Sequence, residues 1–295
     1  TYERGPFSEE DFSVALDELD EKNPDQLEAI MEIWEQNYAE DLATGESYQT
    51  QIHLEKYKAL INLGLANYAL AEARYLVNLT SDTEKESLQT KLGEILLQCG
   101  NYRAPIRFAE RKIKKAIYSN TTYSLPKKIW HLAYPKGYWG QVSKQAESFG
   151  LDPYLVLAVI REESRFHAQA TSRSNAKGLM QIIPKTGKGI AQKLKIKNYR
   201  TSKLYDPSLN IKMGSFYLAS LLQRFSNNVY LALAGYNGGP SRINSYVNNW
   251  YQGKIELIDI DDFIESIPIR ETRLYVQKVM GSYFEYQRLY ERKRG

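Results

Sequence analysis

The pair Glu162-Glu163 is the group of residues in this chain best placed to do acid–base chemistry. It stands near the end of a helix whose start is predicted by Asp152-Pro153, because an aspartate N-cap followed by proline is a typical helix opening. The apolar stripe of this helix consists of Val156, Val159 and Ile160. At about 100° per residue, Glu163 falls on the axis of the stripe, whereas Glu162 lies roughly 120° away from it. We therefore expect Glu163 to face the core side and Glu162 to be solvated.

This placement predicts a raised pKa for the Glu163 carboxyl. Burial removes hydration from the charged form of a carboxyl group, and the negative end of the helix dipole disfavours it further. A carboxyl that keeps its proton near neutrality is the general acid that cleavage of a glycosidic bond requires. The alternative is a structural glutamate paired with an arginine. The sequence offers Arg161, Arg165 and Arg270 for such a pair.

The second half of the chain reads as mainly helical, with connections rich in glycine and polar residues. Asp206-Pro207 repeats the helix-opening signature of Asp152-Pro153. Apolar spacing predicts helices near 140–149, 153–165, 184–193, 207–225, 228–235, 239–248 and 269–290. The run 257–260 is a candidate for a short extended piece. Alternating strands are not indicated, so the predicted fold class is all-α.

The first half reads as a series of amphipathic helices near 8–19, 24–42, 49–62, 65–78, 82–99 and 102–118. Their short connections favour antiparallel pairs stacked into a helical-repeat, superhelical scaffold. The start signal Ser81-Asp82 and the stop signals Gly64 and Gly100 fit this division. A stretch rich in proline, glycine and polar residues interrupts the pattern at about 119–140. We therefore predict a scaffold domain at 1–123 and a second domain at 124–295.

The composition of the chain limits which classes of protein and of partner are compatible with it. The 295 residues are 43% hydrophobic and 25% charged, as in ordinary globular proteins, and the net charge is +4. Basic and acidic residues are interleaved, which argues against nucleic acid as a partner. One cysteine and three scattered histidines predict neither a disulfide framework nor a metal site. No apolar run approaches the roughly 20 residues of a transmembrane helix, and the start at Thr1 carries no information on targeting.

Four blocks of residues in the second half follow one another in a specific order. They are Arg161-Glu162-Glu163-Ser164-Arg165-Phe166, Gly178-Leu179-Met180-Gln181-Ile182-Ile183-Pro184, Gly235-Tyr236-Asn237-Gly238-Gly239-Pro240, and the run 265–276, which begins Glu265-Ser266-Ile267-Pro268. Over about 140–290 this set resembles the lysozyme-like catalytic domain of the soluble lytic murein transglycosylases. The N-terminal helices are consistent in architecture with the superhelical domain that precedes it in that family.

The resemblance implies a role for eight residues. Glu163 would be the sole catalytic acid/base, and Ser164 would support its carboxyl or the adjoining loop. Ser172 and Gln181 match residues that contact the saccharide. The remaining matches are Tyr236 and Asn237, which face the catalytic carboxyl, Glu271, which contacts the product sugar, and Tyr275, one turn beyond it. The sequence departs from the family at Gly235, where alanine is usual, and at Ile183, where methionine is common.

The family's chemistry follows as an expectation. Glu163 would cleave the MurNAc–GlcNAc bond of peptidoglycan without water and leave a 1,6-anhydro product, with no metal or cofactor. The substrate implies the periplasm or cell envelope, and the N-terminal helices could dock wall-assembly partners. A hydrolytic muramidase and a non-catalytic glycan-binding scaffold are the alternatives. We expect replacement of Glu163 by glutamine to abolish cleavage and the same change at Glu162 to be nearly silent.

Overall fold

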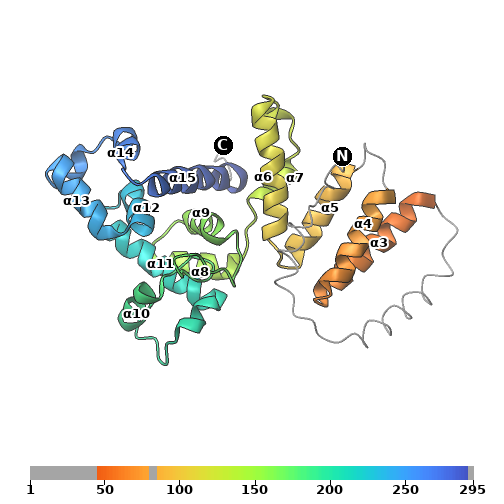
Figure 1. Ribbon diagram of the computed structural model, residues 1–295, viewed down its shortest axis with the longest axis horizontal. Coiled ribbons are helices and arrows are strands. Elements are labelled where there is room, and N and C mark those ends of the chain that lie inside the picture. Colours follow the sequence, from red (N-terminus) through yellow and green to blue (C-terminus); the bar gives the residue numbers. More distant parts are fainter. Residues whose placement is uncertain (1–44, 80–84, 292–295) are drawn as a thin grey trace. The chain divides into compact units, whose positions relative to one another are not determined.

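The computed structural model describes residues 45–79 and 85–291. The helices predicted near 8–19 and 24–42, and the start signal Ser81-Asp82, lie outside these ranges. The described residues form α-helices joined by short loops and 3-10 turns (Figure 1). Within them, β-type pairing is limited to two isolated bridges, Thr171 with Lys177 and Lys177 with Ile182. The predicted all-α class is confirmed.

The chain divides into two compact units, one ending at Pro135 and the other starting at Lys136. The boundary predicted near residue 124 lies earlier, at the end of the 3-10 turn η2 (Thr122–Ser124). The difference comes from helix α7 (Lys127–Ala133), which was not predicted because Pro126 and Pro135 bracket only two helical turns. Its buried Ile129 and Leu132 pack in one cluster with residues of α6, so α7 belongs to the first unit.

The first unit is built from paired helices in sequence order. They are α3 (Gly45–Asn62), α4 (Ala66–Leu79), α5 (Lys85–Gln98) and α6 (Arg103–Tyr118), followed by α7. α3 packs on α4, and α5 packs on α6 and α7. Gly64, with φ +74°, makes the tight turn between α3 and α4, a conformation that favours glycine. One core cluster includes Tyr57, Leu76, Leu92 and Leu96, all almost fully buried.

The second unit contains the eight helices that carry the proposed site. They are α8 (Trp139–Phe149), α9 (Pro153–Ser164), α10 (Pro184–Lys193), α11 (Pro207–Arg224), α12 (Val229–Gly238), α13 (Pro240–Tyr251), α14 (Ile260–Ser266) and α15 (Arg270–Tyr290). Both predicted N-caps are confirmed: Asp152 accepts a hydrogen bond from Tyr154 N at 2.7 Å, and Asp206 from Leu209 N at 2.7 Å. α14 was not predicted. Of the extended piece considered at 257–260, only Ile258 and Asp259, the N-cap of α14, have extended backbone.

Packing around α9 and α11 fixes the core of the second unit. Every residue of α9 from Leu155 to Ile160 is buried, so this helix is enclosed on all sides rather than along one stripe. α15 packs along α9, and α11 packs against α8, α10 and α12. In the described ranges, no helix is both long and apolar enough to cross a membrane.

A buried asparagine holds the turn that leads to the predicted cleft residue Gln181. Asn210 Oδ1 accepts from Met180 N at 2.7 Å, and its Nδ2 donates to Lys177 O at 2.9 Å and Leu204 O at 2.7 Å. Gly178 adopts φ +77°, and a Cβ there would lie 2.1 Å from Leu204 O. The turn therefore depends on glycine at 178 and on the carboxamide of Asn210.

Replacing Asn210 by alanine should destabilise the second unit by about 3 kcal/mol, because it strands buried backbone groups without hydrogen-bond partners. Urea unfolding followed by circular dichroism measures the loss. Asn249→Ala, at an exposed position of α13, is the matched control and should change stability by less than about 0.5 kcal/mol. Equal effects of the two changes would contradict the role given to Asn210.

Candidate active site

The candidate catalytic residue Glu163 lies in the last turn of α9. The helix ends at Ser164, and Arg165 follows as C-cap in the left-handed conformation, with φ 51°. Ser164 Oγ lies 2.8 Å from Leu179 O and 3.2 Å from Ile160 O, and it can donate to either. This hydroxyl therefore ties the end of α9 to the loop before α10.

Burial raises the pKa of the Glu163 carboxyl to about 8. The residue keeps some accessible surface, but its carboxyl group is desolvated. A hydrogen-bonding interaction with the Tyr275 hydroxyl opposes the shift, whereas the negative charges of Glu162 and Glu271 add to it. None of these groups is a cation, so the neighbourhood favours the protonated acid.

Two tyrosine hydroxyls adjoin this carboxyl. Tyr275, on α15, is 8% exposed and interacts with Glu163, but its hydroxyl has no hydrogen-bond partner of normal geometry among the described residues. Such contacts in unliganded sites often tighten only when substrate binds. Tyr236, on α12, donates to Met180 O at 2.8 Å. Burial, reinforced by the charge of Glu163, raises the pKa of both tyrosines well above its usual range, so both remain neutral donors.

The expectation that Glu162 is solvated is wrong. Its side chain is only 13% exposed and forms an ion pair with Arg161, and it accepts a hydrogen bond from Ser282 Oγ at 2.6 Å. The reason is tertiary: α15 packs along α9 and covers the face that an isolated helix would expose. Arg161, one of the cations considered for a structural pair with Glu163, is thus paired with Glu162.

Asn237 and Glu271 lie where α12 meets α15. Thr272 Oγ1 donates to Asn237 Oδ1 at 2.8 Å, and a Cβ at Gly238 would lie 2.9 Å from the same hydroxyl oxygen. Thr272 was not predicted, although it directly follows the predicted Glu271. Glu271 itself is exposed, yet close enough for its charge to act on Glu163.

The departure at Gly235 has a steric explanation. A Cβ at this position would lie 2.9 Å from Cε2 of Phe225, an aromatic side chain that is 1% exposed. An alanine there would require the ring to shift. Gly235 therefore allows α12 to pack closely against the end of α11 without disturbing Tyr236.

The loop between α9 and α10 holds the two other predicted saccharide contacts. Gln181, at φ 46°, donates through Nε2 to Gly178 O at 2.8 Å and to Ala170 O at 3.2 Å. Ser172 Oγ accepts from Ala176 N at 3.0 Å. Both side chains hold the loop in shape, so their described contacts are local and do not reach Glu163.

The side chains around Glu163 suit proton transfer. Across residues 45–79 and 85–291, no three histidine, cysteine, aspartate or glutamate side chains gather as a metal site would require. The site instead combines one protonated carboxyl with two neutral hydroxyl donors. Such a set can give a proton to a leaving oxygen and later accept one from an attacking hydroxyl.

Residues 141–258 match the family model described as "Transglycosylase SLT domain", which confirms the resemblance predicted from the four blocks of residues. The chain is 33% identical over 167 residues to a putative soluble lytic murein transglycosylase of Haemophilus influenzae, covering 56% of this chain and 28% of that protein. It is also 33% identical over 189 residues to the membrane-bound lytic murein transglycosylase C of Edwardsiella ictaluri, covering 59% and 52%. The chain thus spans about a quarter of the length of the soluble relatives it matches.

Solved structures extend the similarity beyond this domain. The 70 kDa soluble lytic transglycosylase of Escherichia coli superposes with a TM-score of 0.62 at 26% identity, covering 82% of this chain and 36% of that one. An inactive mutant of the lytic transglycosylase Slt of Pseudomonas aeruginosa gives a TM-score of 0.58 at 26% identity, covering 84% and 38%. These matches confirm the predicted fold class, a helical domain followed by a lysozyme-like domain.

Replacing Glu163 by glutamine should stabilise the protein at neutral pH. The carboxyl releases its proton near pH 4.5 in the unfolded chain but near pH 8 in the folded one, so the free energy of unfolding falls as pH rises through this interval. The amide of glutamine does not titrate, so the free energy of unfolding of the variant does not fall in this way. We expect Glu163→Gln to gain about 2 kcal/mol near neutrality and almost nothing at about pH 4.

Urea unfolding at both pH values measures the gain. Glu256→Gln, at an exposed position, is the control and should show no such difference. An effect of Glu163→Gln that is the same at both pH values would contradict the buried, protonated state of this carboxyl.

Proposed function

We propose that the chain acts as a peptidoglycan lytic transglycosylase, with Glu163 as its acid and then its base. The observation that carries the proposal is the Glu163 carboxyl, held protonated by burial at the end of α9, in a domain of the transglycosylase SLT family. Several relatives at about 33% identity are named lytic murein transglycosylases, which supports the same substrate.

In the first step, Glu163 donates its proton to the oxygen between MurNAc and GlcNAc as the bond from this oxygen to the anomeric carbon breaks. The N-acetyl carbonyl oxygen of the same MurNAc stabilises the positive charge that develops there. Tyr275 can then donate a hydrogen bond to the newly formed Glu163 carboxylate, which keeps the charged form accessible during turnover.

In the second step, the Glu163 carboxylate accepts the proton of the C6 hydroxyl while O6 attacks the anomeric carbon. The 1,6-anhydro ring closes, the carboxyl regains its proton and no water is consumed. Nucleophile and electrophile belong to one bound sugar, which supplies the orientation that a second enzyme group would otherwise provide.

A mechanism with a single carboxylate fits the contacts of Glu162, the carboxyl group adjacent to Glu163 in the sequence. Ordinary glycosidases use two carboxylates that flank the bond. Glu162 is engaged by Arg161 and Ser282, and turning towards a substrate would break both contacts. In this proposal Glu271 contacts the product sugar and does not act at the anomeric centre.

The other assignments complete the proposal. Ser164 supports the end of α9, and Asn237 is oriented by Thr272. Ser172, Gln181, Tyr236 and Glu271 contact the sugars of the strand. The substrate places the protein in the periplasm or cell envelope, and the N-terminal helices offer a surface for wall-assembly partners.

Glu163→Gln should reduce cleavage of purified peptidoglycan by about a thousandfold or more. The variant loses the general acid of the first step and the general base of the second, and the two losses combine. Mass spectrometry of the wild-type digest should show muropeptides that are lighter than the hydrolytic products by one water and resist borohydride reduction. The control Glu256→Gln should retain full activity. Reducing MurNAc ends would instead identify a hydrolytic muramidase, and a wild type that releases no product would favour a binding scaffold.

Glu162→Gln should shift the pH dependence of kcat/KM, in place of the silence expected for a solvated side chain, because Glu162 is only 13% exposed and its charge acts on the Glu163 carboxyl. Activity should fall as pH rises past the pKa of Glu163, near 8, where the general acid loses its proton. Removing the negative charge of Glu162 lowers this pKa, so the falling limb should move to lower pH. A limb that stays in place while the variant remains folded would contradict the electrostatic coupling.

A further inference from the structure

Positive charge is concentrated at the end of the first unit, in residues 103–135. This stretch holds eight lysine and arginine residues against one acid, Glu110, a formal charge of +7. Because the whole chain carries +4, all its other residues together carry −3. The interleaving of basic and acidic residues expected for the chain does not hold in this part of it. Such a local excess of one sign indicates a surface for an anionic partner.

The cations meet several apolar side chains where α6 ends and α7 begins. α6 runs to Tyr118, the 3-10 turn η2 follows at Thr122–Ser124, and α7 begins at Lys127. α6 packs against both η2 and α7, so this connection forms one end of the helix pair (Figure 1). We call residues 114–127 the α6–α7 tip.

The tip presents large apolar side chains to solvent. Tyr118 is 80% exposed and Tyr123 is 87% exposed, more than any other large apolar side chain among the described residues, and Ile117 is 61% exposed. α6 already buries Phe108 and Ile113 in its core contacts, so the tip side chains are additional to its core face. Single exposed apolar residues are ordinary, whereas three within seven positions indicate an interaction surface.

Hydrogen bonds hold the backbone of the tip in a defined shape. Thr121 N donates to Ala116 O at 2.8 Å, Ser124 Oγ to Thr121 O at 2.7 Å, and Ser119 Oγ to Lys115 O at 3.0 Å. The apolar side chains are therefore exposed on a formed turn, which reduces the ordering needed when a partner binds.

Cationic side chains adjoin the apolar ones. A hollow of about 500 Å³ at the end of α6 is lined by Arg111, Lys114, Lys115, Tyr118 and Ser119. Among the described residues, no aspartate or glutamate lines it. Lys114 Nζ lies 5.9 Å from the centre of the Tyr118 ring, so charge and apolar surface are side by side.

The helix dipole accounts for only part of this charge. A cation in the last turn of a helix, such as Lys115 in α6, is favourable, but Lys127 is the first residue of α7, where the dipole disfavours a cation. Its neighbour Lys128 pairs with Glu94 at 3.2 Å. Lys127 forms no ion pair with any residue in the described ranges. An external anion would offset this unfavourable placement.

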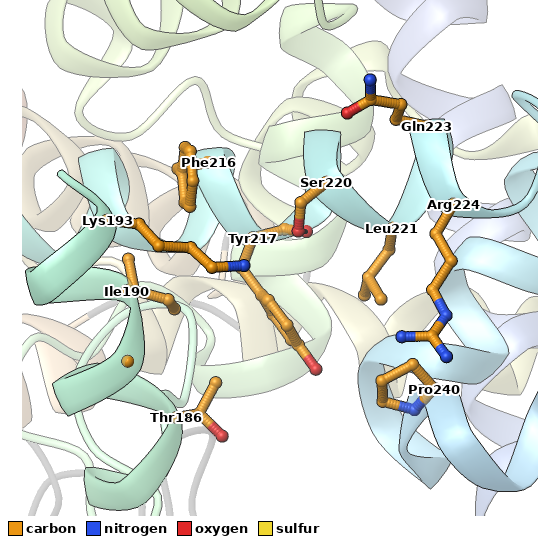
Figure 2. A pocket seen from close by; sticks show the side chains of 11 residues that line it. Thr186, Ile190, Lys193, Phe216, Tyr217, Ser220, Leu221, Gln223, Arg224 and Pro240 are labelled. Carbon is orange, nitrogen blue, oxygen red and sulfur yellow. Dashed lines mark hydrogen bonds between the residues drawn. The ribbon is translucent and has the colours of Figure 1, made fainter.

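Another hollow with cations has different walls. In the second unit, a cavity of about 490 Å³ lies among α10, α11 and the start of α13, with Lys193 and Arg224 on either side of Tyr217 (Figure 2). Its lining also includes three polar side chains, Thr186, Ser220 and Gln223. None of its apolar lining residues is exposed, and the Tyr217 ring lies 5.3 Å from that of Tyr236, in the site already described. Cations beside strongly exposed apolar side chains therefore distinguish the tip.

This combination selects among anionic partners. A soluble polyanion would neutralise the lysines but leave Ile117 and the two tyrosines in water. A bilayer with anionic lipids matches both features, because its phosphates attract lysine and its interfacial region accommodates the ring and the polar end of tyrosine.

We propose that the α6–α7 tip docks on a membrane surface that contains anionic lipids. Lys114, Lys115 and Lys127 contact the phosphates, and Ile117, Tyr118 and Tyr123 enter the headgroup region. This interaction lies beyond the proposed function and does not depend on it.

The test is cosedimentation of the full chain with lipid vesicles. The protein should bind vesicles of phosphatidylglycerol and phosphatidylcholine in equal parts at least about tenfold more tightly than vesicles of phosphatidylcholine alone. The binding should weaken in about 1 M salt, where the Debye length is about 3 Å. Lys114→Ala combined with Lys115→Ala should weaken it about twentyfold, since each cation near the surface contributes about fivefold.

Lys185→Ala combined with Lys188→Ala is the matched control, because it removes the same charge from exposed positions of α10. This variant should bind the mixed vesicles like the wild type. The four lysines are all exposed, and circular dichroism checks that each variant keeps its fold. Equal binding to both kinds of vesicle, no binding to either, or an equal loss in the control would each overturn the proposal.

The tyrosines separate a membrane from a soluble polyanion. Tyr118→Ser combined with Tyr123→Ser should weaken vesicle binding about tenfold, because two rings no longer enter the interface. The same variant should bind soluble polyphosphate as the wild type does. A loss of the same size on both ligands, or no loss on vesicles, would assign the tip to a soluble polyanion instead. These measurements need no turnover, so a wild type that forms no anhydro products would refute the proposed function alone.

Discussion

The desolvated carboxyl of Glu163 is the constraint around which the second unit is arranged. A buried carboxylate without a cation is unfavourable, so the group keeps its proton to about pH 8 and costs stability wherever the unfolded chain would release it. The nearest charges, those of Glu162 and Glu271, increase this penalty. A structural glutamate would be neutralised by an arginine, whereas here Arg161 is drawn to the adjacent Glu162. The instability is typical of a site selected for reactivity.

The surrounding elements keep this carboxyl in place by packing and by hydrogen bonds to backbone groups. α15 covers α9 and supplies Tyr275 and Ser282, while Ser164 and Tyr236 fasten the loop before α10 through Leu179 O and Met180 O. Asn210, on α11, holds the same loop through Met180 N. Because three separate helices fix one short loop, the proposed cleft is largely preformed, which reduces the reorganisation needed when a substrate binds.

The cavity beside Tyr217 differs from the catalytic centre in its electrostatics. Acidic neighbours surround Glu163 and favour a bound proton, whereas the cations Lys193 and Arg224 line the cavity and favour a bound anion. Two tyrosine rings separate these environments, so each keeps its own charge preference over a short distance.

Local signals in the sequence determined much of the second unit. The aspartate–proline pairs at 152–153 and 206–207 set two helix starts, because capping and the fixed φ of proline act within a few residues. Helical periodicity placed Glu163 towards the core, and the ordered motifs pointed to the family.

The tertiary structure alone decided the rest. Glu162 is buried because α15 covers it, and Asn210 and Thr272 gain their roles from residues 30 and more positions away. The cavity at Lys193 and Arg224 likewise exists only where α10, α11 and α13 meet. Helix periodicity describes an isolated helix, and long-range packing determines which of its faces is left to water.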